Sequence, residues 1–241
     1  MTEIAGILVV LPMMRNADVV TNVTEREESL GSVIKGALKD PTFTMIFLGF
    51  FSCGFQLAFV TAHFPAFISE VCSAIPPDSI LRSIGISTTS SLGAFSIAMI
   101  GAANIVGTIA AGALGKYYSK KYLLALIYTG RTIAAVLFIM LPMTPDTVVL
   151  FSLSMGGLWL ATVPLTSGLI GHIYGLKYMG TLFGIVFFSH QLGSFMGVWL
   201  GGIMYDSYGS YDMVWWIGIG VGIFSAIIHL PIREAPVPQP A

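Results

Sequence analysis

The chain alternates long apolar stretches with short polar segments. Six of the stretches reach the length of about 20 residues that a helix needs to cross a bilayer. Their approximate ranges are 43–71, 92–115, 122–141, 147–171, 179–204 and 213–231. Apolar residues follow one another without alternating, which excludes the short alternating strands of a membrane barrel. The pattern predicts an all-α, polytopic membrane protein with six transmembrane helices.

Composition supports a lipid-facing surface. Of the 241 residues, 55% are hydrophobic and 10% are charged, whereas soluble domains carry roughly a quarter of charged residues. This excludes a disordered chain, an ordinary cytosolic enzyme and a nucleic-acid binder, because eleven Lys and Arg residues spread between apolar blocks form no basic face. The lipid bilayer is therefore an expected partner, and nucleic acid is not.

The polar segments divide the chain into parts. Residues 1–14 include an apolar stub too short to span, without the charged start of a signal peptide, and we interpret them as the remnant of a transmembrane helix. Residues 15–42 form a polar connector, 43–231 the six-helix transmembrane domain, and 232–241 a tail.

Lys and Arg are distributed very unevenly between the two sides. With the connector and the tail on one side, that side holds nine of them, Arg82 lies on the other, and Arg131 lies within a span. By the positive-inside rule, both termini face the cytoplasm, and the protein is integral to the cell (inner) membrane.

Small residues and prolines bear on helix packing. Rows such as Gly193, Gly197 and Gly201 at helical spacing let helix backbones approach closely, either as fixed contacts or as sliding surfaces. Pro65 and Pro164 each remove a backbone donor inside a span, which predicts a bend, with or without a ligand cavity beside it.

Several polar residues fall at membrane depth. Arg131 lies near the middle of the third span, where an arginine costs roughly 2.5–3.5 kcal/mol to insert. No Asp or Glu lies deep in a span, so the partners open to Arg131 are backbone carbonyls, Asn104, a neutral histidine or a bound anion. It either attracts an anionic substrate or ties helices together.

Two further groups are candidates for a substrate pathway. His190 and Gln191 occupy the middle of the fifth span, and His190 shares a helix face with small residues, so it points into the bundle. In the first span, three polar residues lie seven positions apart and are expected to form a stripe that runs toward the outer side. They are Gln56, His63 and Glu70.

Thr162 and Thr166 flank Pro164 as secondary candidates, because such hydroxyls most often bond to carbonyls of their own helix.

No pattern indicates catalysis. The sequence has no glycine-rich phosphate loop, no metal-ligand spacing of Cys and His, and no nucleophile elbow. Cys53 and Cys72 lie on one predicted helix, about 28 Å apart, too far for a disulfide. We expect no enzyme activity, no catalytic residue, no cofactor and no metal.

The segment 112–121 (GALGKYYSKK) resembles the signature loop of the major facilitator superfamily, Gly-x-Leu-x-Asp-Arg-x-Gly-Arg-Arg, with Lys116 in place of the Asp and Ser119 in place of the second Gly. A closer resemblance, to bacterial facilitators of the monocarboxylate and oxalate/formate porter group, covers about residues 1–235. The segments that carry it are Gln56–Pro65, Leu123–Arg131, Val163–Gly168, Ser189–Gly193 and Gly201–Trp215.

The resemblance implies a carboxyl-terminal six-helix half of a twelve-helix bundle. In that family the first, second, fourth and fifth spans line the cavity, and the third and sixth lie outside. This disfavours Arg131 as a site residue and leaves Thr166 secondary. The substrate-binding residues that it favours are Gln56, His63, Asn104, Thr162, His190 and Gln191.

The function implied is secondary transport of a small-molecule substrate by alternating access, with an organic anion such as a carboxylate as the expected class. The porters' Asp-x-x-x-Arg pair is replaced here by Asn104 and Thr108. Because half a facilitator leaves its polar faces open, an amino-terminal half or a second copy is an expected partner. The alternative is a non-transporting membrane protein, or a truncated half, that binds or regulates a partner transporter.

Overall fold

The computed structural model describes residues 30–236. In this part the chain is all-helical, and the predicted stub lies outside it. The helices are α2 (Leu30–Lys39), α3 (Pro41–Val71), α4 (Ile80–Ser83), α5 (Thr89–Leu114), α6 (Lys120–Met140), α7 (Pro145–Leu158), α8 (Thr162–Tyr174), α9 (Met179–Tyr208) and α10 (Asp212–His229).

The six predicted spans are confirmed. Six segments of the described chain are long and apolar enough to cross a membrane, and their ends fall within a few residues of the expected ones. Five are single helices, whereas the fourth, Pro145–Tyr174, consists of α7 and α8 in sequence.

Several helices begin at a residue whose side chain caps the first turn. Asp40 accepts a bond from the N–H of Thr42 at 2.8 Å, and Thr88 and Thr144 form capping boxes.

The two prolines occupy different positions in their helices. Helix α3 continues through Pro65 as one element, and the bend expected there stays a prediction. The fourth span is broken, but the break lies between Leu158 and Thr162, before Pro164, which occupies the first turn of α8. A proline is tolerated in a first turn because the N–H groups there have no partner within the helix.

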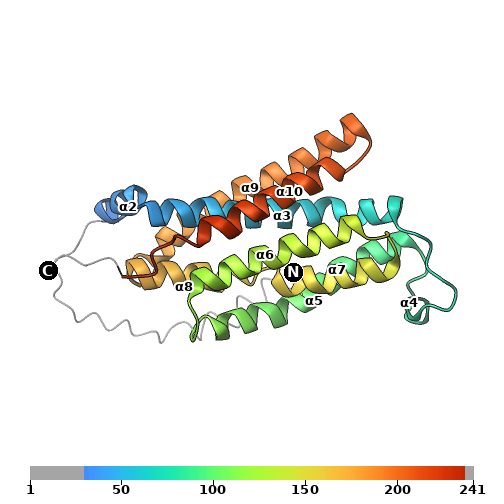
Figure 1. Ribbon diagram of the computed structural model, residues 1–241, viewed down its shortest axis with the longest axis horizontal. Coiled ribbons are helices and arrows are strands. Elements are labelled where there is room, and N and C mark those ends of the chain that lie inside the picture. Colours follow the sequence, from blue (N-terminus) through green and yellow to red (C-terminus); the bar gives the residue numbers. More distant parts are fainter. Residues whose placement is uncertain (1–29, 237–241) are drawn as a thin grey trace, which may run out of the picture.

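Helix α3 runs through the middle of the bundle, packed against α9, α10 and α5 (Figure 1). Helix α5 pairs with α7, and α6 pairs with α10. Within an apolar 18-residue stretch of each span, 67% of the residues are buried inside the bundle in the first span, against 11% in α5 and 28% in α9. The α5 and α9 surfaces are therefore the ones that this chain covers least.

Rows of glycine residues allow α3 and α9 to pack in close contact. A Cβ at Gly193 or Gly197 would collide with the backbone carbonyls of Phe51 and Phe55, and one at Gly54 would collide with the carbonyl of His190. These helices thus touch backbone to backbone, as expected for small residues at helical spacing.

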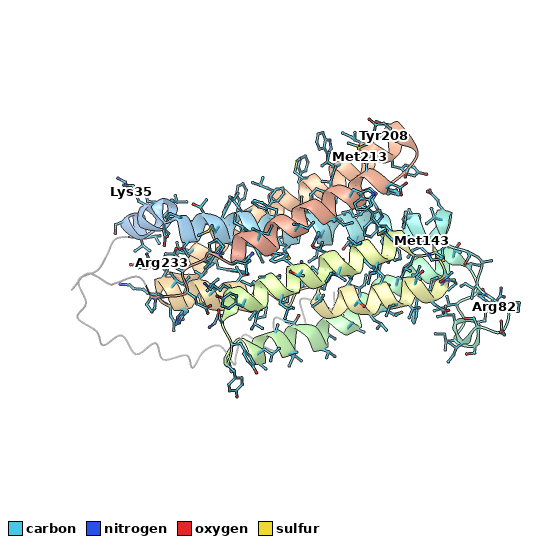
Figure 2. The ribbon with its side chains drawn as sticks, in the orientation of Figure 1. Lys35, Arg82, Met143, Tyr208, Met213 and Arg233 are labelled. Atoms are coloured by element: carbon cyan, nitrogen blue, oxygen red, sulfur yellow. The ribbon has the colours of Figure 1, made fainter. Side chains whose placement is uncertain are left out.

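Charged residues gather at the ends of the bundle. Figure 2 places Lys35 and Arg233 at one end and Arg82 at the other. The first end, called the α2 end below, also holds the start of α6, where Lys120 and Lys121 lie. Helix α2 was not predicted, because the segment from 15 to 42 was interpreted as a polar connector; its buried residue Ala37 packs on the bundle.

Two apolar clusters fill the interior. The cluster toward the opposite end of the bundle, where α4 lies, is aromatic. In it Phe138 stacks on Phe151 with the ring centroids 4.3 Å apart, and Trp215 contacts both rings. The cluster toward the α2 end contains Phe43, Phe50 and Leu165. A layer of polar side chains lies near the middle of the bundle, and one of them, Cys53, belongs to the second cluster.

Candidate functional site

Five helices contribute to this polar layer, and five of its residues, one on each helix, interact with one another or with the break in the fourth span. Each residue lies ten to twelve positions from the end of its helix at the α2 end of the bundle. At 1.5 Å per residue this depth is about 15–18 Å, near the middle of a hydrocarbon core of about 30 Å. The residues are Cys53 on α3, Asn104 on α5, Arg131 on α6, Thr162 on α8 and His190 on α9.

Cys53, Thr162 and His190 form one side of the layer. The Cys53 Sγ and Thr162 Oγ1 atoms are 3.3 Å apart, and both side chains are fully buried. His190 is half-buried and lies close enough to interact with the Cys53 thiol. Its ring stacks on Phe187 at 5.0 Å, and its Nδ1 is 3.4 Å from the Ser194 hydroxyl. The site therefore joins α3, α8 and α9.

Arg131 is fully buried and reaches the break in the fourth span. Its Nε and Nη2 donate to the carbonyl of Leu158 at 2.9 and 2.7 Å, and Nη2 also donates to the carbonyl of Trp159. The guanidinium lies 5.4 Å from the ring centroid of Tyr128. Of the partners open to Arg131 in the sequence, the structure selects backbone carbonyls.

Asn104 meets the same break from the opposite helix. Its Oδ1 accepts the N–H of Leu160 at 2.9 Å and the hydroxyl of Thr108 at 3.0 Å. An unpaired backbone group in hydrocarbon costs several kcal/mol. Asn104 and Arg131 together thus satisfy the groups that the broken helix frees.

The layer contains the guanidinium of Arg131. Every Asp and Glu of residues 30–236 lies at a helix end or in a connecting segment, such as Glu70, which accepts the Tyr205 hydroxyl at 2.6 Å. No carboxylate of the described chain therefore neutralises the guanidinium. The layer favours a negative charge over a positive one.

Three buried polar atoms of this region have no hydrogen-bond partner within the described residues. They are Nη1 of Arg131, Nε2 of His190 and Oγ1 of Thr166. Native interiors rarely leave such groups unpaired. Arg131 and Thr166 offer donors, and His190 offers a donor or an acceptor according to its tautomer. Each can bind a polar group, and the Arg131 donor also suits an anion.

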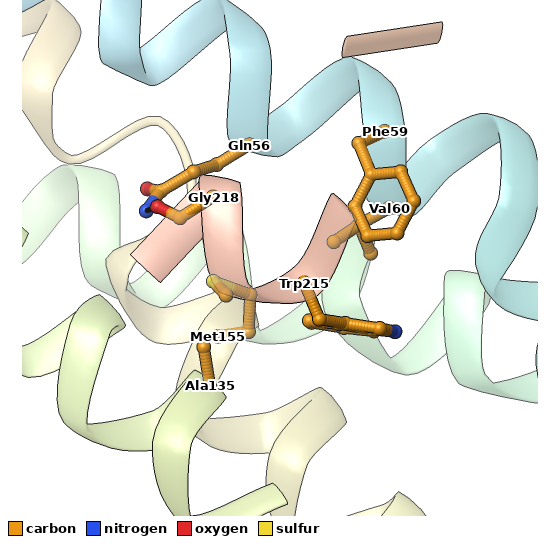
Figure 3. A pocket seen from close by; sticks show the side chains of 7 residues that line it. All are labelled: Gln56, Phe59, Val60, Ala135, Met155, Trp215 and Gly218. Atoms are coloured by element: carbon orange, nitrogen blue, oxygen red, sulfur yellow. Dashed lines mark hydrogen bonds between the residues drawn. The ribbon is translucent and has the colours of Figure 1, made fainter. Parts of the chain in front are cut away.

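The stripe predicted on α3 faces neighbouring helices. Gln56 is buried and donates from Nε2 to the carbonyl of Gly218 on α10 at 2.9 Å, whereas Nε2 of His63 lies 3.0 Å from the carbonyl of Val198 on α9. Figure 3 shows Gln56 beside Gly218 at a small cavity that Trp215 also lines. That cavity holds about 10 Å³, room for roughly one water molecule and not for a solute.

The remaining predicted residues are divided between the core and the surface. Thr166 is fully buried on α8, one turn beyond Thr162, while Gln191 is exposed on α9 beside His190. The structure thus brings Thr162 and His190 together beside Cys53, whereas Asn104 bonds to the break at Leu160, and Gln56 and His63 bond to α10 and α9. Whether these residues bind substrate stays a prediction.

Cys53 is the residue of the layer that sequence reasoning did not select. We considered it only as a disulfide partner, and both cysteines are free. Its position three residues before Gln56, at the depth of His190, was the available signal. In the described chain no group of three or more His, Cys, Asp or Glu residues is placed to hold a metal ion.

The comparison with known families agrees with this arrangement. The model of the Major Facilitator Superfamily matches residues 68–241, more than half of the chain. The chain therefore belongs to the Major Facilitator Superfamily, a family of membrane transporters and not of enzymes.

A curated relative extends the same conclusion. The chain is 26% identical over 196 residues to the uncharacterized MFS-type transporter YcxA of Bacillus subtilis (strain 168). The aligned region covers 77% of this chain and 43% of the relative. The chain thus spans less than half the length of that relative.

Proposed function

We propose that this chain forms six helices of a secondary active transporter that moves a small organic anion, such as a carboxylate, by alternating access. The observation that carries the proposal is the polar layer, which lies near the middle of the helices and is built by five of them. Burying polar groups is costly, so a layer that packing alone does not require points to a ligand.

The anionic class rests on the charge of that layer. Arg131 has no carboxylate near it in the described chain. The two carbonyls that it bonds to could be paired by a neutral hydrogen-bond donor and do not require a positive charge. An arginine at this depth costs more than a neutral donor. A bound anion offsets that cost, and His190 and Thr162 lie on the side of the layer where it would be held.

The partner is an amino-terminal six-helix half or a second copy of this chain. Helices α5 and α9 have the largest uncovered surfaces, and α9 carries Gln191 and half-buried His190 on or beside its open face. A polar face at mid-depth is unfavourable against lipid. In the membrane we orient the α2 end toward the cytoplasm because most Lys and Arg lie there.

Uptake into proteoliposomes tests the proposal. Vesicles hold this chain alone, or this chain co-expressed with an amino-terminal half, and labelled mono- and dicarboxylates are compared with neutral amides of the same size. We expect saturable uptake of a carboxylate, abolished in His190→Ala and retained in Arg82→Gln, whose side chain lies outside the layer. Lack of uptake in both kinds of vesicle would refute transport and favour the non-transporting alternative.

A further inference from the structure

A groove lies between α6 and α7, which run side by side (Figure 1), and it holds about 270 Å³. Its lining comes from one face of each helix, with residues at positions i, i+3, i+4 and i+7. The lining residues are Ala134, Leu137, Phe138 and Leu141 on the α6 side, and Thr147, Leu150, Phe151 and Ser154 on α7. The groove therefore runs along both helices.

The shape of the groove follows from the sizes of these side chains. Phe138 and Phe151 are buried and stacked on each other, so they form its floor. Leu137 and Leu150 are 53% and 62% exposed and form its walls. Ser154 lies at its inner end, where a larger side chain would fill the space. The result is a narrow apolar slot that opens on the surface of two membrane spans.

The groove extends through most of one leaflet of the bilayer. Figure 2 shows Met143, in the segment that joins α6 to α7, toward the end of the bundle that holds Arg82. From Thr147 to Ser154 the lining face of α7 rises about 10 Å at 1.5 Å per residue. One leaflet contributes about 15 Å to a hydrocarbon core of about 30 Å. A hydrocarbon chain of that leaflet thus matches the groove in direction and length.

We propose that this groove binds one acyl chain of a phospholipid from the leaflet on the side of α4. Its volume lies above the roughly 150 Å³ that holds benzene and below the roughly 300–1,000 Å³ of pockets for larger ligands. The Thr147 hydroxyl already bonds to the carbonyls of Pro142 and Thr144, so the lining offers little to a polar ligand. An empty slot would forfeit dispersion contacts, which a chain from the surrounding lipid supplies.

Charge at the surface end of the groove indicates the headgroup. Asp146 is exposed beside Thr147. Among the described residues, the basic residue at this end of the bundle is Arg82, whose guanidinium donates to the carbonyls of Ile75 and Pro76. A carboxylate attracts an ammonium and repels an anion. The phospholipid is therefore one with an ammonium in its headgroup, such as phosphatidylethanolamine.

A protein segment is a poorer occupant of the groove. The surfaces that this chain leaves most open are those of α5 and α9, whereas the groove lies between α6 and α7. A partner that covers α5 and α9 leaves the groove facing lipid. The proposal does not depend on transport, so its failure and that of the proposed function are separate outcomes.

Photolabelling of the reconstituted chain tests the proposal. The probe is phosphatidylethanolamine with a diazirine midway along one acyl chain, and labelled residues are mapped by mass spectrometry. We expect Leu137, Leu141 and Leu150 to be labelled about tenfold more than Ile133 and Leu153, a preference of 1.4 kcal/mol. These two comparison residues are similarly exposed on the same helices, outside the groove. Equal labelling of the two sets, or a groove left unlabelled because protein covers it, would overturn the proposal.

Competition identifies the lipid. Unlabelled phosphatidylethanolamine should displace the probe from the groove, and phosphatidylglycerol with the same chains should displace it less. Displacement by free fatty acid but not by phosphatidylethanolamine would show a different ligand and refute the phospholipid. Equal displacement by the two phospholipids would refute the role of Asp146.

Filling the groove provides matched variants on both helices. Ala134→Trp and Ser154→Phe place a large side chain in the groove, whereas Ile133→Trp and Leu153→Phe place the same side chain beside it. We expect each filling variant that is folded by size-exclusion chromatography to lose about tenfold of the groove labelling. The two control variants should keep it. Undiminished labelling in a folded filling variant would refute the acyl-chain site.

Discussion

Glu234 gives the sharpest test of how the end of the chain is held. The backbone N–H groups of Lys120 and Lys121 donate to its carboxylate at 3.0 and 3.3 Å, and the Ser119 hydroxyl donates as well. Helix α6 has no side-chain cap of its own, so a residue beyond α10 caps it. We predict that Glu234→Ala destabilises the protein through α6.

The magnitude follows from the bonds that are lost. Removal of an N-cap side chain costs about 1–2 kcal/mol. The Lys120 ammonium, 3.7 Å away, adds little because both side chains are partly exposed. We therefore expect a loss of about 1–2 kcal/mol. Glu234→Gln should lose less, since its amide oxygen still accepts a bond.

The pH dependence has a definite sign. Burial alone would raise the pKa of Glu234, but the bonds from Ser119, Lys120 and Lys121 hold that pKa below its usual value of 4.5. A lowered pKa in the folded state stabilises the protein above the unfolded-state pKa and stops doing so as the pH falls through the folded-state value. The stability difference between the natural chain and Glu234→Ala should thus be largest at neutral pH and shrink in acid to about the difference between Glu234→Gln and Glu234→Ala.

Thermal unfolding in detergent, followed by tryptophan fluorescence at several pH values, measures this difference. Arg233→Ala is the control, because its exposed side chain adjoins Glu234 in the chain. Equal losses from both substitutions, or a loss from Glu234→Ala that does not change with pH, would refute the capping role.

Three further predictions concern the membrane interior. His190→Ala should abolish uptake while the protein stays folded and inserted, as judged by size-exclusion chromatography; unchanged uptake would remove His190 from the site. Arg131→Ala should lower yield and melting temperature, because two carbonyls lose their donor, and should weaken carboxylate binding, because the layer loses its charge; unchanged affinity in the folded protein would remove Arg131 from the anion site. Gly193→Leu should separate α3 from α9 and prevent folding, whereas Gly184→Leu, at an open position, should be tolerated.

The spans could be predicted because each is about 20 apolar residues long, and the bilayer sets that length. The partners of polar residues could not be predicted in the same way. The spacing of Gln56 and His63 places them on related faces of α3, but spacing on one helix does not specify the neighbouring helix. Since α9 and α10 cover α3, the two residues bond to α10 and α9 respectively.

The break in the fourth span shows a similar limit. Pro164 predicted an interruption, yet its position depends on where tertiary partners can accept the freed groups. Arg131 and Asn104 lie opposite residues 158–160, so the chain breaks there, ahead of the proline. Cys53 and Glu234 went unnoticed for the same reason: their partners are distant in sequence.

Arg131 and the break depend on each other energetically. An unpartnered arginine at mid-depth costs roughly 2.5–3.5 kcal/mol, and each carbonyl left unpaired costs about 1–3 kcal/mol. Either feature alone is therefore unfavourable in lipid, whereas together the guanidinium supplies the donors that Leu158 and Trp159 lack. Replacing Arg131 with an apolar residue removes the cost of the buried charge but leaves the carbonyls of Leu158 and Trp159 unpaired. Full stability therefore also requires that the fourth span be made a continuous helix. The stability of this chain thus couples the charge of Arg131 to the break in the fourth span.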